Sequence, residues 1–113
     1  MDTKRQERIG RQLQKDLGEI FLEMARQTQG VMISVTNVRV TSDLSLARIY
    51  LSIFPAGKVD ATLEWVKEQA KTIRFELGKR VRHQLRVVPE LSFFIDDSLD
   101  YIDNIDRLLK QNQ

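Results

Sequence analysis

Hydrophobic residues recur every three or four positions through the first part of the chain, and this spacing predicts a helix over residues 4–27. At 100° per residue, the apolar side chains fall within about 120° of arc, which is typical of a helix that covers a core. They are Ile9, Leu13, Leu17, Ile20, Phe21 and Met24. Gly30 then interrupts the pattern, so we expect the helix to end before it.

The next residues alternate between apolar and polar, which predicts two strands. In "VMISVTNVRV" the alternation through Val35 restarts one residue out of phase at Val38, as an inserted residue near Thr36–Asn37 would produce. We therefore predict a β-bulge there. "TSDLS" has the residues of a turn, and "ARIYLSIF" alternates again as an antiparallel partner that ends at Pro55.

A helical pattern returns after Asp60, which is a plausible N-cap. Its apolar positions fall within about 80° of arc and predict one long helix. They are Leu63, Val66, Ala70, Ile73, Leu77 and Val81. Because the whole pattern extends over about 25 residues, long for a globular helix, we expect a kink, either at Gly78 or near Ala70–Thr72.

Pro89 precedes the predicted third strand "ELSFFID", with Leu91, Phe93 and Ile95 on one face. Ser98 is then expected to cap a short C-terminal helix, in which the apolar residues are Leu99, Ile102, Ile105, Leu108 and Leu109. The predicted order is helix, two strands, a kinked helix, a strand and a helix. This order indicates an α+β domain whose three-stranded sheet is covered by helices on one face.

Length and composition limit the classes of protein. A chain of 113 residues, 42% hydrophobic and 30% charged, is sufficient for one folded domain, expected over residues 1–113. No apolar stretch approaches the 18–20 residues, roughly, that span a bilayer, and the first residues lack the apolar core of a signal peptide. The absence of cysteine excludes disulfides and thiolate metal sites and fits a cytoplasmic location.

The net charge of +2 conceals an uneven distribution. Residues 67–88 hold seven Lys or Arg and two Glu, whereas residues 90–113 hold six acids and two bases. The cations of the first segment are Lys67, Lys71, Arg74, Lys79, Arg80, Arg82 and Arg86. Such asymmetry points either to a polyanionic partner or to charge pairing inside the molecule.

The basic side chains also cluster by face. On the long predicted helix, Lys71, Lys79, Arg82 and Arg86 fall between about 80° and 160° from Leu63, away from the apolar stripe. The first helix repeats this arrangement within about 60° of arc, although like charges at this spacing repel. Its cations are Lys4, Arg8, Arg11 and Lys15. We interpret both groups as a phosphate-binding surface, the alternative being two solvated helix flanks.

Phe75 and Gly78 lie on or beside the basic flank of the long helix. An aromatic ring can stack on an RNA base, and a glycine permits close approach of a backbone. The sequence equally allows Phe75 to lie at the edge of the core and Gly78 to be a packing contact. Trp65 falls off the apolar stripe and could contact either a partner or the terminal segments.

No catalytic or cofactor-binding motif is present, so we predict neither enzymatic activity nor a cofactor. The acidic segment contains Asp96, Asp97, Asp100, Asp103 and Asp106. It lacks the glycine and glutamate of an EF-hand loop, and Asp100 and Asp103 follow Ser98 where a helix dipole favours anions. We therefore predict no metal site.

Three motifs together resemble the ribosome-binding factor A family. They are "TSDLSLA", "IRFELG" and "LRVVPEL" followed by "FFIDDS", and the resemblance extends over roughly residues 4–109. It implies a single KH-like domain of the second topology, α-β-β-α-α-β, followed by the short C-terminal helix. In this family an Ala-x-Gly kink replaces the GxxG loop of KH domains, and here Ala70 is followed by Thr72 in place of that glycine.

The resemblance further implies a non-enzymatic, monomeric maturation factor that binds 16S rRNA on the immature 30S subunit, assists rRNA processing and acts in cold adaptation. The residues expected to bind RNA are Lys71, Arg74, Lys79, Arg80, Arg82 and Arg86, together with Lys4, Arg8, Arg11 and Lys15. A KH-type RNA-binding module without ribosomal specificity is one alternative. A protein-interaction adaptor that uses Trp65 and the acidic segment is another.

Overall fold

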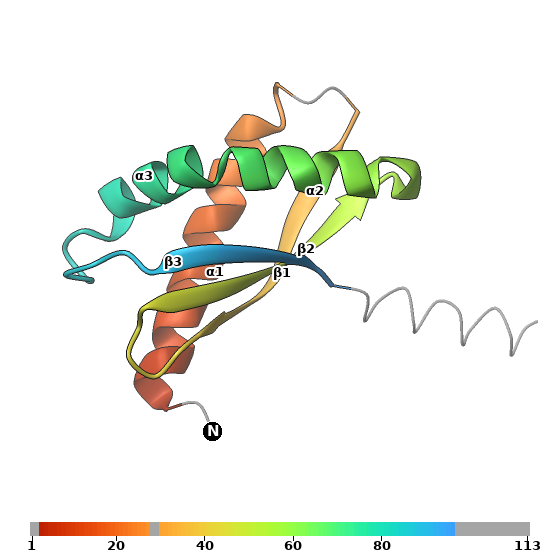
Figure 1. Cartoon of the computed structure of the whole chain (residues 1–113). Coiled ribbons are helices and arrows are strands. Elements are labelled where there is room, and N and C mark those ends of the chain that lie inside the picture. The colour runs from red at the N-terminus through yellow and green to blue at the C-terminus, as the bar shows by residue number, and fades with distance from the viewer. Residues whose placement is uncertain (1–2, 28–29, 97–113) are drawn as a thin grey trace, which may run out of the picture.

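The computed structural model describes residues 3–27 and 30–96 (Figure 1). Its elements are α1 (Lys4–Met24), β1 (Met32–Val40), β2 (Leu46–Phe54), the 3-10 turn η1 (Ala56–Lys58), α2 (Val59–Glu68), α3 (Ala70–Val81) and β3 (Glu90–Ile95). The predicted order α-β-β-α-α-β is confirmed. The helix predicted after Ser98 lies outside the described residues.

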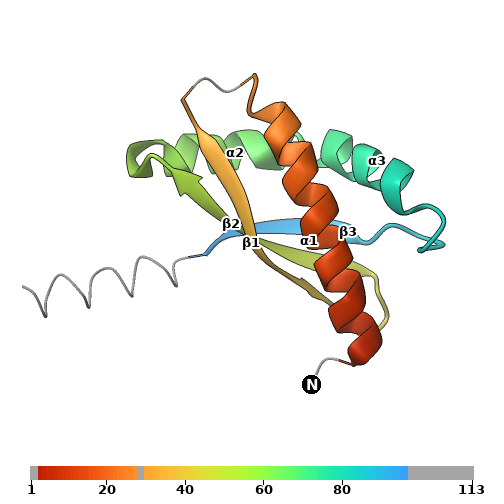
Figure 2. The same cartoon turned by 180° about the vertical axis from the view of Figure 1, so that it is seen from behind.

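The three strands form one sheet in the order β1-β2-β3, with β1 and β2 antiparallel and β2 and β3 parallel. Alternate residues of β2 point to opposite faces, and Ile49 and Leu51 are buried whereas Arg48 and Phe54 are exposed. The helices therefore cover one face of the sheet, as predicted, and the views from both sides show α1 across β1 and β2 (Figures 1 and 2).

The predicted β-bulge is present in β1. Val35 pairs with Leu51 and Asn37 pairs with Tyr50, so Thr36 is the extra residue. The Thr36 hydroxyl lies 3.2 Å from the carbonyl oxygen of Tyr50 and 2.5 Å from a carboxylate oxygen of Asp96. The bulge returns the second half of β1 to the phase in which its apolar side chains enter the core.

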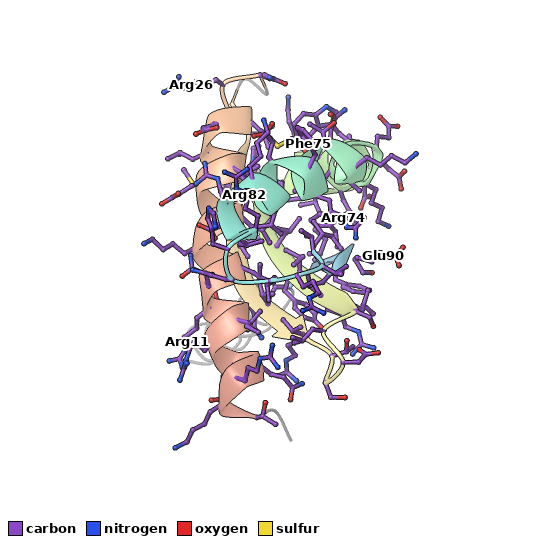
Figure 3. All side chains as sticks on the ribbon, turned by 90° about the vertical axis from the view of Figure 1, so that its left-hand side faces the viewer. Arg11, Arg26, Arg74, Phe75, Arg82 and Glu90 are labelled. Carbon is purple, nitrogen blue, oxygen red and sulfur yellow. The ribbon has the colours of Figure 1, made fainter. Side chains whose placement is uncertain are left out.

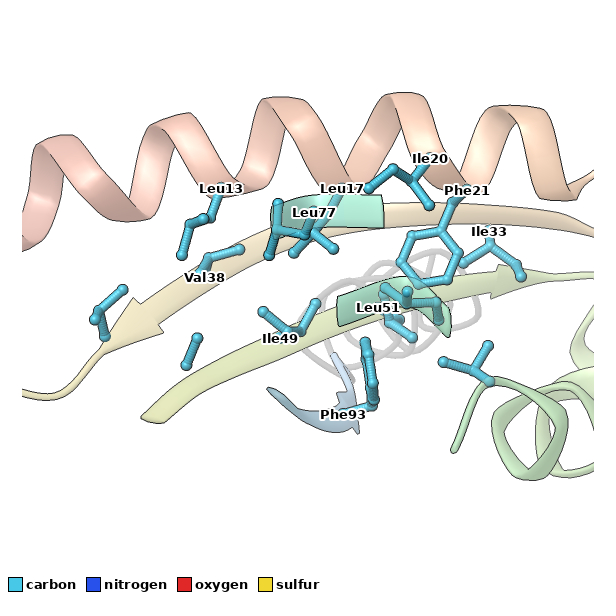
Figure 4. Packing of buried hydrophobic residues seen from close by; sticks show 14 of the residues in the cluster. Leu13, Leu17, Ile20, Phe21, Ile33, Val38, Ile49, Leu51, Leu77 and Phe93 are labelled. Carbon is cyan, nitrogen blue, oxygen red and sulfur yellow. The ribbon is translucent and has the colours of Figure 1, made fainter. Parts of the chain in front are cut away.

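The core joins α1 and α3 to the sheet (Figure 4). Leu13 and Leu17 of α1, Ile49 of β2 and Leu77 of α3 are fully buried. The rings of Phe21 on α1 and Phe93 on β3 meet edge to face, with centroids 6.2 Å apart and an interplanar angle of 82°. These contacts fix the position of α3, which carries Lys71, Arg74, Lys79 and Arg80 of the predicted RNA-binding residues.

The N-terminus of α1 is stabilised by a reciprocal capping box. The Gln6 backbone N–H donates to Thr3 Oγ1 at 3.2 Å, and the Thr3 N–H donates to Gln6 Oε1 at 2.9 Å. The Gln6 side-chain amide also donates to the Val40 carbonyl at 2.9 Å. One buried side chain thus caps the helix and ties it to the end of β1.

The predicted turn at residues 41–45 closes the hairpin around Asp43. Its carboxylate accepts hydrogen bonds from the Thr41 and Ser45 hydroxyls at 2.8 Å and from the Ser45 N–H at 3.1 Å. The bonds from Ser45 and then Thr41 lower the pKa of Asp43 below its ordinary value. Leu44 has a φ of 61°, a left-handed conformation that is unusual for a leucine.

The structure corrects one detail of the long predicted helix and decides between the two positions predicted for its kink. The prediction that Asp60 is the N-cap is wrong, because η1 leads directly into α2 with Lys58 at the N-cap position. Asp60 instead lies in the first turn, where its negative charge interacts favourably with the helix dipole. The predicted kink occurs at Gln69, next to Ala70, and Gly78 lies within the continuous helix α3.

Candidate nucleic-acid interface

A groove of about 670 Å³ follows the outer side of α3 and the loop that leads to β3. Its lining residues are Lys71, Arg74, Phe75, Gly78, Lys79, Arg82 and Val88. Six of these seven are residues that the sequence predicted for RNA binding, and the structure brings them together. We refer to this feature as the α3 groove.

The spacing of apolar residues in α3 explains why these side chains face solvent. Ile73, Leu77 and Val81 are buried at intervals of four residues, which fixes one face of α3 against the core. Positions 71, 75, 78 and 82 follow one another at intervals of four, three and four residues, and they form a second stripe on an outward face.

Arg74 holds the wall of the α3 groove. Its Nε donates to the Pro89 carbonyl at 3.2 Å and its guanidinium donates to the Val88 carbonyl at 2.6 Å. These two bonds fasten the loop after α3 to the middle of the helix. Arg74 therefore contributes positive charge to the groove while its donors stabilise the fold.

Phe75 is exposed, so its placement at the edge of the core, one of the two readings the sequence allowed, is wrong. The residue is 64% exposed, and Lys79 Nζ lies 4.6 Å from the centroid of its ring in a cation–π contact. Lys79 also lies 3.4 Å from a carboxylate oxygen of Glu76. An exposed aromatic ring beside cations can accept a stacked base.

Gly78 lies where Val88 of the loop approaches α3. A Cβ built at this position would lie 3.3 Å from Val88 Cγ2, tighter than most real contacts. The glycine thus lets Val88 approach the helix and keeps the floor of the groove free of a side chain. Val88 was not predicted from the sequence, since only the fold brings this loop residue onto α3.

Arg80 points away from the groove, toward α1. Its guanidinium forms ion pairs with Glu19 and with Glu23, the latter at 3.5 Å. The prediction that Arg80 shares one basic edge with Arg82 is therefore wrong, because Arg80 faces α1 whereas Arg82 lines the groove. Arg86 lies exposed in the loop after α3 and is not among the residues that line the groove.

Replacing Arg80 with alanine is expected to lower the free energy of unfolding by about 0.5–1 kcal/mol, because both carboxylates that it pairs with are at least half exposed. Urea denaturation measures this change. Lys79→Ala, which removes an exposed pair with Glu76 and an exposed cation–π contact with Phe75, is the matched control and should change stability less. A larger loss of stability for Lys79→Ala would contradict this assignment of Arg80.

The cations of α1 form a separate group. Lys4, Arg8, Arg11 and Lys15 are all exposed, as predicted. Arg11 lines a second groove of about 570 Å³ between α1 and β1, together with Gln6, Glu7, Gly10, Gln14, Asn37, Val38 and Arg39. Figure 3 views the molecule from the side where α3 ends, and in this view Arg82 lies between Arg11 and Phe75. Of the four α1 cations, only Arg11 lines this second groove, and none of them lines the α3 groove.

Arg39 is a cation of this second groove that the sequence analysis did not single out. It pairs across the sheet with Arg48, and both are exposed on the face that the helices leave open. Like charges directly opposite each other on neighbouring strands destabilise a sheet. The strand alternation, extended to the polar positions, could have identified this pair.

The described residues contain neither a candidate metal site nor a candidate membrane span. In residues 3–27 and 30–96, no three His, Asp or Glu side chains converge as metal ligands, and no helix is long and apolar enough to cross a membrane. Asp97, Asp100, Asp103 and Asp106 lie outside this range. Trp65, considered above as a partner contact, is half-buried and packs against the core.

The order α-β-β-α-α-β, with a mixed three-stranded sheet and a break between α2 and α3, defines a KH-like α+β domain. The sequence also matches the profile of the family "Ribosome-binding factor A" over residues 5–109. The chain belongs to this family, whose members are binding factors and not known enzymes. The resemblance seen in the sequence motifs is thereby confirmed.

Individual relatives agree with this assignment. Ribosome-binding factor A of Flavobacterium johnsoniae is 52% identical over 111 residues, covering 96% of this chain and 85% of the relative. The protein of Christiangramia forsetii is 46% identical with the same coverage. The crystal structure of ribosome-binding factor A from Thermus thermophilus has a TM-score of 0.65 at 22% identity, covering 80% of this chain and 94% of that one.

A second Thermus thermophilus structure is a homology model of ribosome-binding factor A fitted into the cryo-electron microscopy map of a 30S complex. It has a TM-score of 0.60 at 24% identity and covers 77% of this chain and 90% of that one. At this level of identity, both structural matches support the fold alone.

Proposed function

We propose that this protein binds 16S rRNA on the immature 30S ribosomal subunit and acts there as a maturation factor. The observation that carries the proposal is the α3 groove, where Lys71, Lys79 and Arg82 surround an open hollow in a member of the ribosome-binding factor A family. The Thermus thermophilus relative described in a 30S complex supports the same partner.

Binding would depend mainly on phosphate contacts. Lysine and arginine side chains neutralise phosphates and release counterions, which supplies affinity without requiring a particular base sequence. The cations around the α3 groove would form one set of contacts, and Arg11 with Arg39 in the second groove would form another. A rigid surface that contacts two RNA segments favours the RNA arrangement in which both segments reach it.

This mechanism requires no chemistry by the protein. As a monomer in the cytoplasm, it would stabilise one arrangement of 16S rRNA and so assist processing by other factors. RNA helices that form incorrectly rearrange slowly at low temperature, since strand separation has a high barrier. A protein that holds the productive arrangement is therefore needed most in cold-grown cells.

Co-sedimentation with particles from cold-grown cells tests the proposal. We expect the protein to migrate with free 30S subunits and their precursors in a sucrose gradient, and not with bulk RNA or 70S ribosomes. Equal recovery with all RNA would indicate a KH-type module without ribosomal specificity. Unchanged association after Arg82→Glu and Arg86→Glu together would favour a protein-interaction adaptor and would contradict the RNA interface.

A further inference from the structure

We propose that the α3 groove holds a single unpaired nucleobase, so that the protein prefers RNA with a nucleotide outside a duplex. The proposal rests on the proposed function, since it specifies which feature of an RNA the same site recognises. Two observations carry it. The groove has an apolar floor as well as a cationic rim, and its walls are fixed in position before any ligand binds.

The floor is formed by the Phe75 ring, the bare backbone at Gly78 and the Val88 side chain. Neither the ring nor the Val88 side chain carries a hydrogen-bond donor, so a phosphate group placed there would lose its water without gaining a partner. The face of a nucleobase is apolar and planar and stacks on aromatic rings. The floor therefore matches a base, and the rim matches the phosphates attached to it.

The rim places positive charge along the length of the hollow. Lys71 lies one turn before Phe75 on α3, Lys79 lies one turn after it, and Arg82 follows at the end of the helix. Phosphates on both sides of an extruded nucleotide would each find a cation. The volume of about 670 Å³ also falls within the range of about 300–1,000 Å³ typical of small-molecule sites.

The site is preformed. The two hydrogen bonds from Arg74 to the Val88 and Pro89 carbonyls hold the loop wall, and Pro89 itself is buried. Gly78 allows Val88 to contact α3 directly. Binding would therefore require little ordering of the protein, which favours affinity for a small, rigid ligand such as a base.

An acidic amphipathic helix is the other ligand with matching charge. Such a helix usually inserts apolar side chains at positions i, i+3 or i+4, and i+7, and so needs an apolar track about 10 Å long. Here, the apolar residues that α3 contributes extend only from Phe75 to Gly78, which is less than one turn. The short floor thus favours a single base.

The test compares two RNA hairpins that differ in one unpaired 2-aminopurine in the stem. We expect the full chain to bind the bulged hairpin about tenfold more tightly than the paired one at a fixed salt concentration, measured by fluorescence anisotropy. Binding should also change the emission of 2-aminopurine. Phe75→Leu should abolish both the preference and the emission change, whereas Phe75→Tyr should retain them.

Phe54→Leu is the matched control, because Phe54 is 69% exposed on the helix-free face of the sheet and should leave the preference intact. Both positions are exposed, so neither substitution should affect folding. Equal affinity of wild type for the two hairpins, with a normal salt dependence, would overturn the base site and leave phosphate binding standing. No binding to either hairpin or to 30S particles would overturn the proposed function as well.

Two further outcomes would reject the nucleobase. If Phe75→Leu weakened binding of both hairpins equally, Phe75 would be a general contact and the preference would arise elsewhere. If a synthetic peptide of residues 96–113 bound in a Phe75-dependent manner while the hairpins showed no preference, the groove would be a peptide site. Retention of the preference by Phe75→Leu would equally contradict the proposal.

Discussion

Replacing Gly10 with alanine is expected to lower the free energy of unfolding by about 1–3 kcal/mol, although alanine is the better helix former. Gly10 is buried where α1 crosses β1, and a Cβ built there would lie 2.9 Å from the carbonyl oxygen of Val38. This oxygen belongs to the backbone, so it cannot move aside without shifting β1 or α1. Urea denaturation followed by circular dichroism measures the effect.

Gly18 on the same helix is the matched control. A Cβ there would have no neighbour within 4 Å, so Gly18→Ala should raise stability by about 0.5–1 kcal/mol through helix propensity alone. The two substitutions are chemically identical and are expected to have opposite signs. If Gly10→Ala also stabilised the protein, the close approach of α1 to β1 would not exist in solution.

This difference between two glycines illustrates what the sequence can and cannot predict. Hydrophobic periodicity is a local property, and it predicted α1, the strands and even the bulge at Thr36, because one inserted residue changes the phase of alternation. Both glycines nevertheless lie in the same helical pattern. Only the packing of α1 on β1 distinguishes them, and this packing depends on residues far away in the sequence.

The helix termini were also not predictable from residue type alone. Asp60 has the residue type of an N-cap, but η1 supplies the first turn of α2, so no capping side chain is needed at that position. The break between α2 and α3 needs no glycine either. At Gln69 a backbone with φ −89° and ψ 7° ends one helix and starts the next, and this conformation has a negative φ and so does not require glycine.

In the candidate site, too, some features were predicted from the sequence and others were not. Helical spacing correctly brought Lys71, Phe75 and Arg82 onto one side of α3, because these positions follow each other along the same helix. It could not separate Arg80, whose carboxylate partners are on α1, or foresee that Arg74 holds the loop wall. Spacing within a helix predicts which side chains share a face, whereas tertiary contacts decide which cations remain available to a ligand.

Lys79 and Arg82 are two cations of the α3 groove that remain available to a ligand. Replacing both Lys79 and Arg82 with alanine should weaken binding of any RNA by about 10- to 100-fold near 0.15 M salt. The slope of log affinity against log salt concentration should become shallower by roughly 1–2 units, because fewer counterions are released. Both residues are exposed, and the contacts of Lys79 with Glu76 and with the Phe75 ring lie at the surface, so stability should change little.

The control for this variant must remove the same charge from a different surface. Arg26→Ala with Lys58→Ala is suitable, because both side chains are exposed and neither lines the α3 groove or the groove of Arg11 and Arg39. We expect this pair to leave the salt slope nearly unchanged, which anisotropy titrations at several salt concentrations would measure. An equal loss of RNA affinity in both double variants would mean that binding depends on the total charge of the protein. The arrangement of cations on α3 would then have no special role.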